Sequence, residues 1–160
     1  PGFIDAHCHF LAYGLQQNMI DLSSAKSFND IISLLKNNYS KTNNEWIIGF
    51  GWDQNQWHNK KWPNNELLNE EFKNKNIVLK RVDGHAIMVN QKAIETLNIK
   101  TDTLIDGGYI EVIDDKLTGL FIDNAMHEIA ATTAKYFDVV IEDICFYELY
   151  NISVVIVRYL

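Results

Sequence analysis

The opening segment PGFIDAHCHF joins a short apolar run to two closely spaced histidines. The run Phe3–Ala6 predicts a buried strand. Because side chains alternate between the two faces of a strand, His7 and His9 share one face with Asp5, while Cys8 points to the other. Two imidazoles at this spacing can chelate one divalent ion such as zinc, iron, nickel or copper. His7 and His9 are therefore candidate metal ligands; the alternative is two polar residues in a loop after an edge strand.

Two neighbours of these histidines have chemistry of their own. Asp5 lies one step deeper in the predicted strand, where its carboxylate can steer a ligand or accept a hydrogen bond from one. Cys8 is either a packed, reduced thiol or a thiolate ligand, and strand alternation favours the packed thiol. Together with Cys145 it makes two cysteines, which do not indicate a disulfide framework.

The length of the chain limits how much of a large fold it can contain. With 160 residues, 47% of them hydrophobic, it can bury the core of one ordinary globular domain. A complete (β/α)8 barrel takes about 250 residues, so the chain cannot hold a whole barrel. Because it also starts at Pro1 without an initiator methionine, we expect a fragment or a truncated product.

The charge and the apolar runs exclude two classes of partner. Fourteen basic and 21 acidic residues give a net charge of −7, so nucleic acids and anionic membrane surfaces would repel the chain. The apolar run Ile152–Val157 is far shorter than the roughly 20 residues that a membrane span requires. No signal peptide is visible, and we expect a cytoplasmic location.

Apolar patterns predict alternating strands and helices along the chain. The runs Trp46–Gly51 and Ile77–Val82 predict buried strands, and because a helix separates them we expect neighbouring parallel strands of one sheet. Ser27 with Asp30 resembles a capping box, which begins a predicted helix to Tyr39. The remaining strand predictions are 19–22, 152–157 and a hairpin of 109–113 with 116–119. The remaining helix predictions are 66–72, a helix capped by Asn90 that runs to Leu97, a helix from Asp123 or Asn124 to Ala134, and 142–149.

Four tryptophans are concentrated around the end of the first predicted parallel strand: Trp46, Trp52, Trp57 and Trp62. They form either the hydrophobic core of a loop-rich region or an aromatic wall of a substrate pocket. Asp53 follows Trp52 at the exit of the strand, where a carboxylate could contact a ligand.

A histidine follows the second predicted parallel strand. Asp83 and Gly84 predict a turn that places His85 just past the carboxyl end of that strand. Ligand-facing groups of α/β folds gather at such ends. A single histidine is also common as a structural residue, so both roles stay open for His85.

Several of these segments together resemble the metal-dependent amidohydrolase superfamily. Pro1–His9 is similar to the first barrel strand of its members, which carry Pro-Gly, two hydrophobic residues, Asp-x-His-x-His. Later segments are similar, in matching order, to the YtcJ-like branch, amidohydrolase family 3: they are Gly51–Asp53 with Trp57, Arg81–Ala86 with Val89–Asn90, and Thr118–Leu120 with Asp123–Met126. The resemblance covers residues 1 to 127 and fades beyond them.

The resemblance implies a fold class that the composition alone cannot give. We expect an α/β fold, specifically a partial TIM-type (β/α)8 amidohydrolase barrel with an inserted α/β subdomain. Residues 1–21 would form the first barrel strand and metal loop, residues 22–120 the inserted subdomain, and residues 121–160 the start of the remaining barrel. The end of the chain departs from the family, because Tyr150–Val154 replaces a glycine-initiated strand.

The resemblance also implies an activity. It implies a hydrolase that cleaves a C–N bond in a small-molecule amide, cyclic amide or N-formyl compound, with a divalent ion, zinc in our interpretation, held by His7 and His9. Trp52, Asp53 and His85 would bind the substrate. Further ligands and the aspartate that acts as acid and base would come from later strands, outside this chain, so we expect the chain alone to be inactive.

Two other interpretations stay open. The chain could be a catalytically inactive remnant, an α/β module that binds a ligand or a partner through the surface of residues 46–62. It could also be a His-x-His metal-binding domain without hydrolytic activity. Unpaired edges and exposed apolar faces of the strands at Phe3–Ala6 and Ile152–Val157 would favour aggregation or association with a second copy of the chain.

Overall fold

The computed structural model describes residues 16, 19–39, 45–127 and 129, and the backbone of two strands at 144–149 and 152–157. Contacts divide the chain into two compact units, one of Met19–Tyr136 and one that combines Pro1–Asn18 with Phe137–Leu160. The predicted strand Phe3–Ala6 and the histidines His7 and His9 lie outside the described residues.

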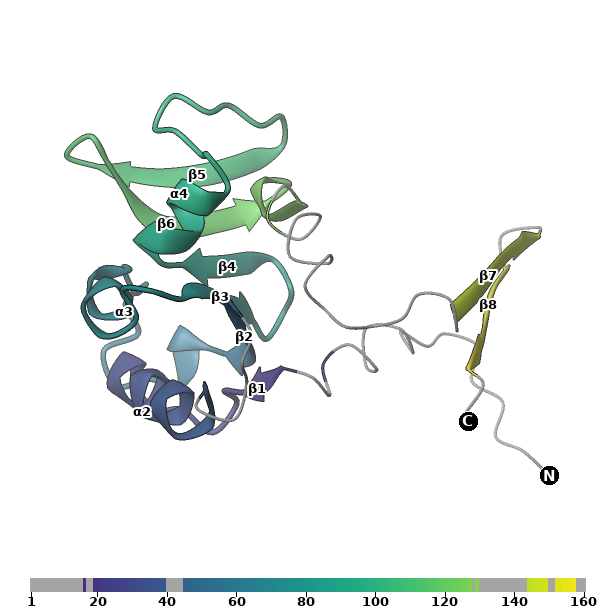
Figure 1. Cartoon of the computed structure of the whole chain (residues 1–160), viewed down its shortest axis with the longest axis horizontal. Helices are drawn as coiled ribbons and strands as arrows, with labels where there is room; N and C mark the ends of the chain where they lie inside the picture. The colour runs from purple at the N-terminus through teal and green to yellow at the C-terminus, as the bar shows by residue number, and fades with distance from the viewer. Residues whose placement is uncertain are drawn as a thin grey trace. The chain divides into compact units, whose positions relative to one another are not determined.

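The unit Met19–Tyr136 is built on a six-stranded mixed sheet with the order β1-β2-β3-β4-β6-β5 (Figure 1). Strands β1, β2 and β3 are parallel to one another, and β4, β6 and β5 continue the sheet with antiparallel neighbours. The strands are β1 Ile20–Asp21, β2 Trp46–Trp52, β3 Asn76–Arg81, β4 Ala86–Val89, β5 Gly108–Ile113 and β6 Lys116–Asp123. The helices are α2 Phe28–Tyr39, α3 Glu66–Glu71 and α4 Gln91–Thr96, with a 3-10 turn η1 at Gln54–Gln56. The fold is therefore mixed α/β, as predicted.

The two predicted parallel strands are neighbours in this sheet. Strands β2 and β3 pair in parallel, with Ile47 opposite Ile77 and Ile48 opposite Val78. This pairing confirms the prediction of a shared sheet. Continuous apolar runs are typical of inner parallel strands, because both faces of such strands are covered.

The two helix caps expected from the sequence are also present. The Ser27 hydroxyl accepts a hydrogen bond from the Asp30 amide at 3.2 Å, and the Asp30 carboxylate accepts one from the Lys26 amide at 2.9 Å. Asn90 is fully buried before α4, where its side-chain oxygen accepts from the amides of Ala93 and Ile77. Asn90 therefore joins the helix to strand β3 as well as capping it.

The two faces of the sheet carry separate hydrophobic clusters. Helices α2 and α3 cover one face, where Leu35 and Leu68 pack with Ile77, Leu79 and residues of β4 and β6. Helix α4 covers the other face, where its Ala93 and Ile94 pack against alternate residues of the same strands. The alternation follows from the two-residue period of a strand.

Three elements of the structure differ from the predictions. Strand β4 was not predicted: Ala86–Val89 is entirely buried and forms a hairpin with β3, but four residues are too few to show a pattern of their own. The predicted helix 142–149 is wrong, because Ile144–Leu149 is strand β7, which pairs antiparallel with β8, Ile152–Val157. Its isoleucine and aromatic residues favour a strand once a partner lies two residues away in sequence. Of the two predicted helix starts, Asp123 is wrong because it ends strand β6, whereas Asn124 directly precedes the helix described at 125–127.

The parts of the chain that the structure describes hold no helix that is long and apolar enough to span a membrane.

Candidate functional site

Polar side chains gather at one edge of the sheet. Parallel strands β2 and β3 end at this edge, and antiparallel pairing brings the start of β4 and the end of β6 to it as well. The side chains that meet there belong to Asp53, Arg81, Asp83, His85 and Asp123, which we call the edge network. In an α/β sheet, the carboxyl ends of the strands are the usual place for a ligand.

Arg81, at the end of β3, is the centre of this network. Its Nε donates to Oε1 of Gln54 at 2.8 Å, its Nη2 donates to Oδ1 of Asp53 at 3.1 Å, and its Nη1 donates to Asp83. The ring of Trp62 lies 5.4 Å from the guanidinium carbon. Only 11% of the Arg81 side chain is exposed, so these partners hold it in one position.

Asp53, a predicted substrate ligand, is largely committed to this network. Its Oδ1 accepts from Arg81 and also from the amide of Asn55 at 3.0 Å, which begins the turn η1. The carboxylate therefore shapes the loop after β2. Its predicted contact with a substrate stays a prediction.

The tryptophans divide into a buried group and one exposed member. Trp52 is 1% exposed, and its Nε1 donates to the carbonyl of Leu79 at 3.0 Å. Trp57 is also buried, whereas Trp62 is 43% exposed and stacks edge to face on Trp52 with ring centroids 5.9 Å apart. Trp52 thus supports Trp62 from behind, and the Trp62 ring keeps an exposed aromatic surface. The contact predicted between Trp52 and substrate stays a prediction.

His85 lies where the turn Asp83–Gly84 was expected to place it. The turn is closed by a 3.0 Å hydrogen bond from the Gly84 amide to the Arg81 carbonyl, and Gly84 has a φ of +73°. The His85 amide donates to Oδ1 of Asp83 at 3.0 Å. The imidazole is 73% exposed, with Nδ1 3.1 Å from Oδ1 of Asp123. His85 is thus positioned by a turn and by a carboxylate 38 residues away in sequence.

Asp83 connects the two parts of the network. One of its oxygens bonds to Arg81, and the other accepts from the amide of His85. The contacts of Arg81 and Asp123 were missed in the sequence, because each joins strands that are far apart along the chain. The only available signal was that both residues occur in the segments that resemble the family.

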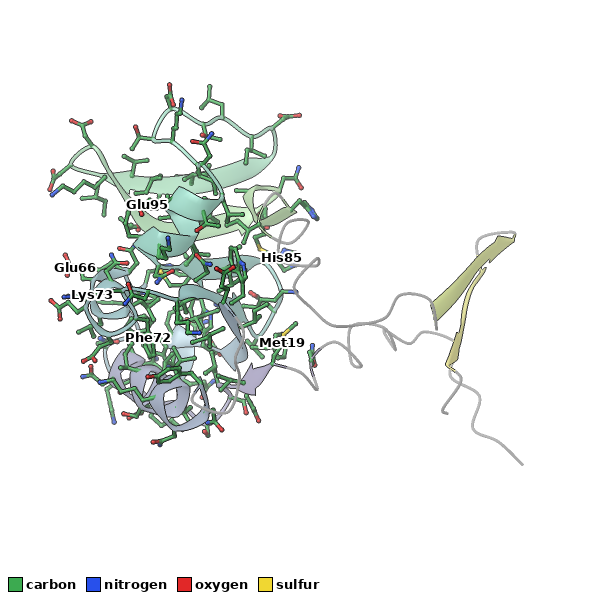
Figure 2. The ribbon with its side chains drawn as sticks, viewed as in Figure 1. Met19, Glu66, Phe72, Lys73, His85 and Glu95 are labelled. Atoms are coloured by element: carbon green, nitrogen blue, oxygen red, sulfur yellow. The ribbon has the colours of Figure 1, made fainter. Side chains whose placement is uncertain are left out.

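A cavity of about 900 Å³ lies elsewhere in the unit, among α3, α4 and the turn between β5 and β6. Glu66 and Glu95 border it, and Figure 2 shows both on the opposite side of the unit from His85. Of the predicted site residues, Trp52, Asp53 and His85 are described by the structure, and none of these three lines the cavity.

The described residues offer no metal centre of their own. Within them, no group of three His, Cys, Asp or Glu side chains converges so as to hold an ion. The predicted ligands His7 and His9 are outside the described ranges, so the metal site stays a prediction.

Comparison with known sequences identifies the family. Residues 1–143 match the sequence model of the amidohydrolase family. The chain belongs to this family. The predicted His-x-His segment and the whole edge network lie within the matched residues.

Two curated relatives support this assignment. A Bacillus subtilis (strain 168) protein named "Putative amidohydrolase YtcJ" is 34% identical over 128 residues, which are 78% of this chain and 24% of that protein. The Arabidopsis thaliana protein LONG AFTER FAR-RED 3 is 27% identical over 129 residues, covering 79% of this chain and 22% of its own length. The chain therefore spans about a quarter of the length of these relatives.

Solved structures of two metal-dependent hydrolases have a similar fold over most of the chain. An uncharacterized metal-dependent hydrolase from Pyrococcus horikoshii OT3 is 28% identical with a TM-score of 0.58, covering 84% of this chain and 24% of its own. A second, from Pyrococcus furiosus, is 27% identical with a TM-score of 0.58, covering 89% and 26%. The resemblance to the YtcJ-like branch is confirmed, and the neighbours support a hydrolase family whose members depend on a metal.

Proposed function

We propose that the chain is part of a metal-dependent amidohydrolase that cleaves a C–N bond in an amide, cyclic amide or N-formyl compound. Residues 1–21 would supply the first strand of a TIM-type barrel, residues 22–120 an inserted substrate-facing subdomain, and residues 121–160 the next part of the barrel. The observation that supports this most is the family match over residues 1–143, which includes His7, His9 and the edge network.

His7 and His9 are the proposed metal ligands. Their neutral imidazoles would bind a divalent ion, zinc in this proposal, and a catalytic zinc site takes about three protein ligands, so others must join them. A bound ion would polarise the substrate carbonyl and activate a water molecule. The acid and base would be an aspartate outside this chain.

The edge network is the proposed substrate-facing surface. Trp62 presents an exposed ring that Trp52 supports from below, and His85 presents an exposed imidazole. Asp53 and Arg81 keep the two loops that carry these groups at a fixed separation. The substrate would be a small molecule, and the charge of −7 argues against nucleic acid as a partner.

Metal binding tests the proposal directly. The 160-residue chain is dialysed against zinc, and bound metal is measured by mass spectrometry for the chain and for the variants His7→Ala, His9→Ala and, as a matched control, His58→Ala. We expect weak binding that is lost in the first two variants and kept in the control, because two imidazoles hold an ion loosely. Binding that survives loss of both His7 and His9 would contradict the proposal.

Turnover gives the second measurement. The chain is assayed with zinc, manganese or cobalt against N-acyl and N-formyl amines. We expect rates several orders of magnitude below those of ordinary enzymes, because part of the ligand set and the acid and base are outside the chain. Metal-dependent turnover at ordinary rates would show that the ligand set is complete within these residues.

A second candidate function is an inactive ligand-binding module. The exposed ring of Trp62 on the compact unit Met19–Tyr136 favours it. A chain that folds, binds no metal and turns over no amide would support this alternative.

A further inference from the structure

His85 and Asp123 face each other across neighbouring strands. Ala86 pairs with Ile122, and the same register places His85 opposite Asp123. The amide of Asp123 donates to the carbonyl of His85 at 3.0 Å, and the side chains meet at 3.1 Å between Nδ1 and Oδ1. Backbone and side-chain contacts therefore agree on one pairing.

The backbone on each side of this pair is held in place. Asp83 accepts from the amide of His85, and on the other strand Asp123 has a φ of +52°. Such left-handed backbone is uncommon for residues other than glycine and is retained where neighbouring structure fixes it. Here the Asn124 side chain donates to the Asp106 carbonyl at 2.8 Å and anchors the chain directly after Asp123.

The chemistry of the pair selects one tautomer of His85. An ionised carboxylate can only accept hydrogen bonds, so the nitrogen that faces Asp123 must carry a hydrogen. In the neutral ring the other nitrogen, Nε2, then has a free lone pair. We propose that Asp123 is a positioning residue that holds His85 as the Nδ1–H tautomer, so that Nε2 accepts a hydrogen bond from an N–H or O–H group of the ligand.

This inference rests on the proposed function only in assuming that the ligand reaches His85. It adds the chemical class of the contact: the ligand group at His85 is a donor, such as an amide N–H or a hydroxyl. A carbonyl oxygen would find no donor at Nε2 of the neutral ring.

Other charges near His85 do not replace the pairing with Asp123. Asp83 accepts from the His85 amide rather than from the ring, and Lys80 on β3 pairs with Ile87, two residues after His85. The hydrogen bond that Nδ1 donates to Asp123 is therefore the contact that distinguishes Nδ1 from Nε2.

Nitrogen NMR of the imidazoles tests the tautomer without any activity assay. The 160-residue chain, labelled with ¹⁵N in its histidines, is measured at about pH 8.5, where an ordinary histidine with a pKa of about 6.5 is neutral. We expect the Nδ1 resonance of His85 at the position of a protonated ring nitrogen and the Nε2 resonance at that of an unprotonated one. Dominance of the Nε2–H tautomer in the unchanged chain would overturn the proposal.

Two variants separate the side-chain bond from the fold. Asp123→Gly tolerates left-handed backbone and removes the side-chain acceptor altogether, so we expect the Nδ1–H preference of His85 to be lost while the amide spectrum stays folded. Asp114→Gly is the matched control, because Asp114 has a φ of +50° in the turn between β5 and β6. An unchanged His85 signal in Asp123→Gly would contradict the role of Asp123.

The outcome is independent of the proposed function. A chain that binds no metal and hydrolyses no amide can still show the Nδ1–H tautomer, and a metal-binding chain can still show the opposite one. The two proposals therefore fail in different measurements.

Discussion

Strand β3, in the parallel half of the sheet (β1 to β3), is more deeply buried than β5, the edge strand of the antiparallel half (β4 to β6). The first four residues of β3 are buried, whereas no residue of β5 is, and Tyr109, Val112 and Ile113 of that strand are exposed. Parallel strands have both faces covered by helices, while an antiparallel edge can face solvent. Stability should therefore depend on side-chain packing more in β3 than in β5.

In the antiparallel half, main chains approach each other closely at two glycines. A Cβ on Gly119 in β6 would lie 2.2 Å from the carbonyl oxygen of Val89, and Gly119 has a φ of +89°. A Cβ on Gly108 in β5 would lie 2.4 Å from the amide nitrogen of Ala125. Two glycines thus allow main chains of this half to approach each other closely.

The largest expected effect is the loss of packing in the parallel half. Leu79→Ala removes a fully buried side chain of β3 and should lower the free energy of unfolding by about 2–5 kcal/mol. Ile113→Ala on β5, where the side chain is 55% exposed, should change it by about 0.5 kcal/mol or less. Urea unfolding followed by tryptophan fluorescence measures both, because all four tryptophans are in this unit. Equal losses of unfolding free energy in the two variants would show that packing contributes no more in β3 than in β5.

A backbone substitution tests the antiparallel half. Gly119→Ala meets both left-handed backbone and a clash with Val89, and should lower the free energy of unfolding by about 3 kcal/mol. Gly84→Ala is the matched control: its φ is +73°, but a Cβ there has no neighbour within 4 Å among the described residues, so it should lose about 1 kcal/mol. Similar urea midpoints for the two variants would show that the close approach in β6 costs nothing.

Elements marked by a local sequence pattern could be predicted, whereas elements that depend on pairing with other strands could not. Strands β2 and β3 are continuous apolar runs, and Asn90 and Asp83–Gly84 are local cap and turn signals, so these features were predicted correctly. Strand β4 has four residues and depends on partners in β3 and β6, so no local pattern marks it. Strand β7 depends on pairing with β8 in the same way.

The candidate site shows the same limit. The turn that carries His85 is local and was predicted, but the partner of His85 is 38 residues away, and Arg81 meets Asp53 across 28 residues. Such contacts follow from sheet order and register, which a single sequence does not determine. Burial also decides which tryptophan is accessible, and composition could not distinguish Trp62 from Trp52.

The smallest expected effect concerns Lys80, a charged residue near the end of β3, the strand that joins the parallel half to the antiparallel half. Burial lowers the pKa of its ammonium group. The unfolded chain therefore binds more protons in the window between this lowered pKa and the ordinary value of about 10.4, and stability should rise with pH across that window. Lys80→Met should raise the free energy of unfolding at neutral pH by on the order of 1 kcal/mol and should remove this rise.

Urea midpoints between about pH 7 and pH 10.4 measure the Lys80 effect. The matched control is Lys73→Met, because Lys73 is exposed just before the same strand and should leave the pH profile unchanged. If Lys80→Met and the unchanged chain have parallel profiles, the ammonium is as well solvated in the folded state as in the unfolded state. Lys80 would then belong with the polar residues Arg81 and His85, and the buried part of β3 would end at Leu79.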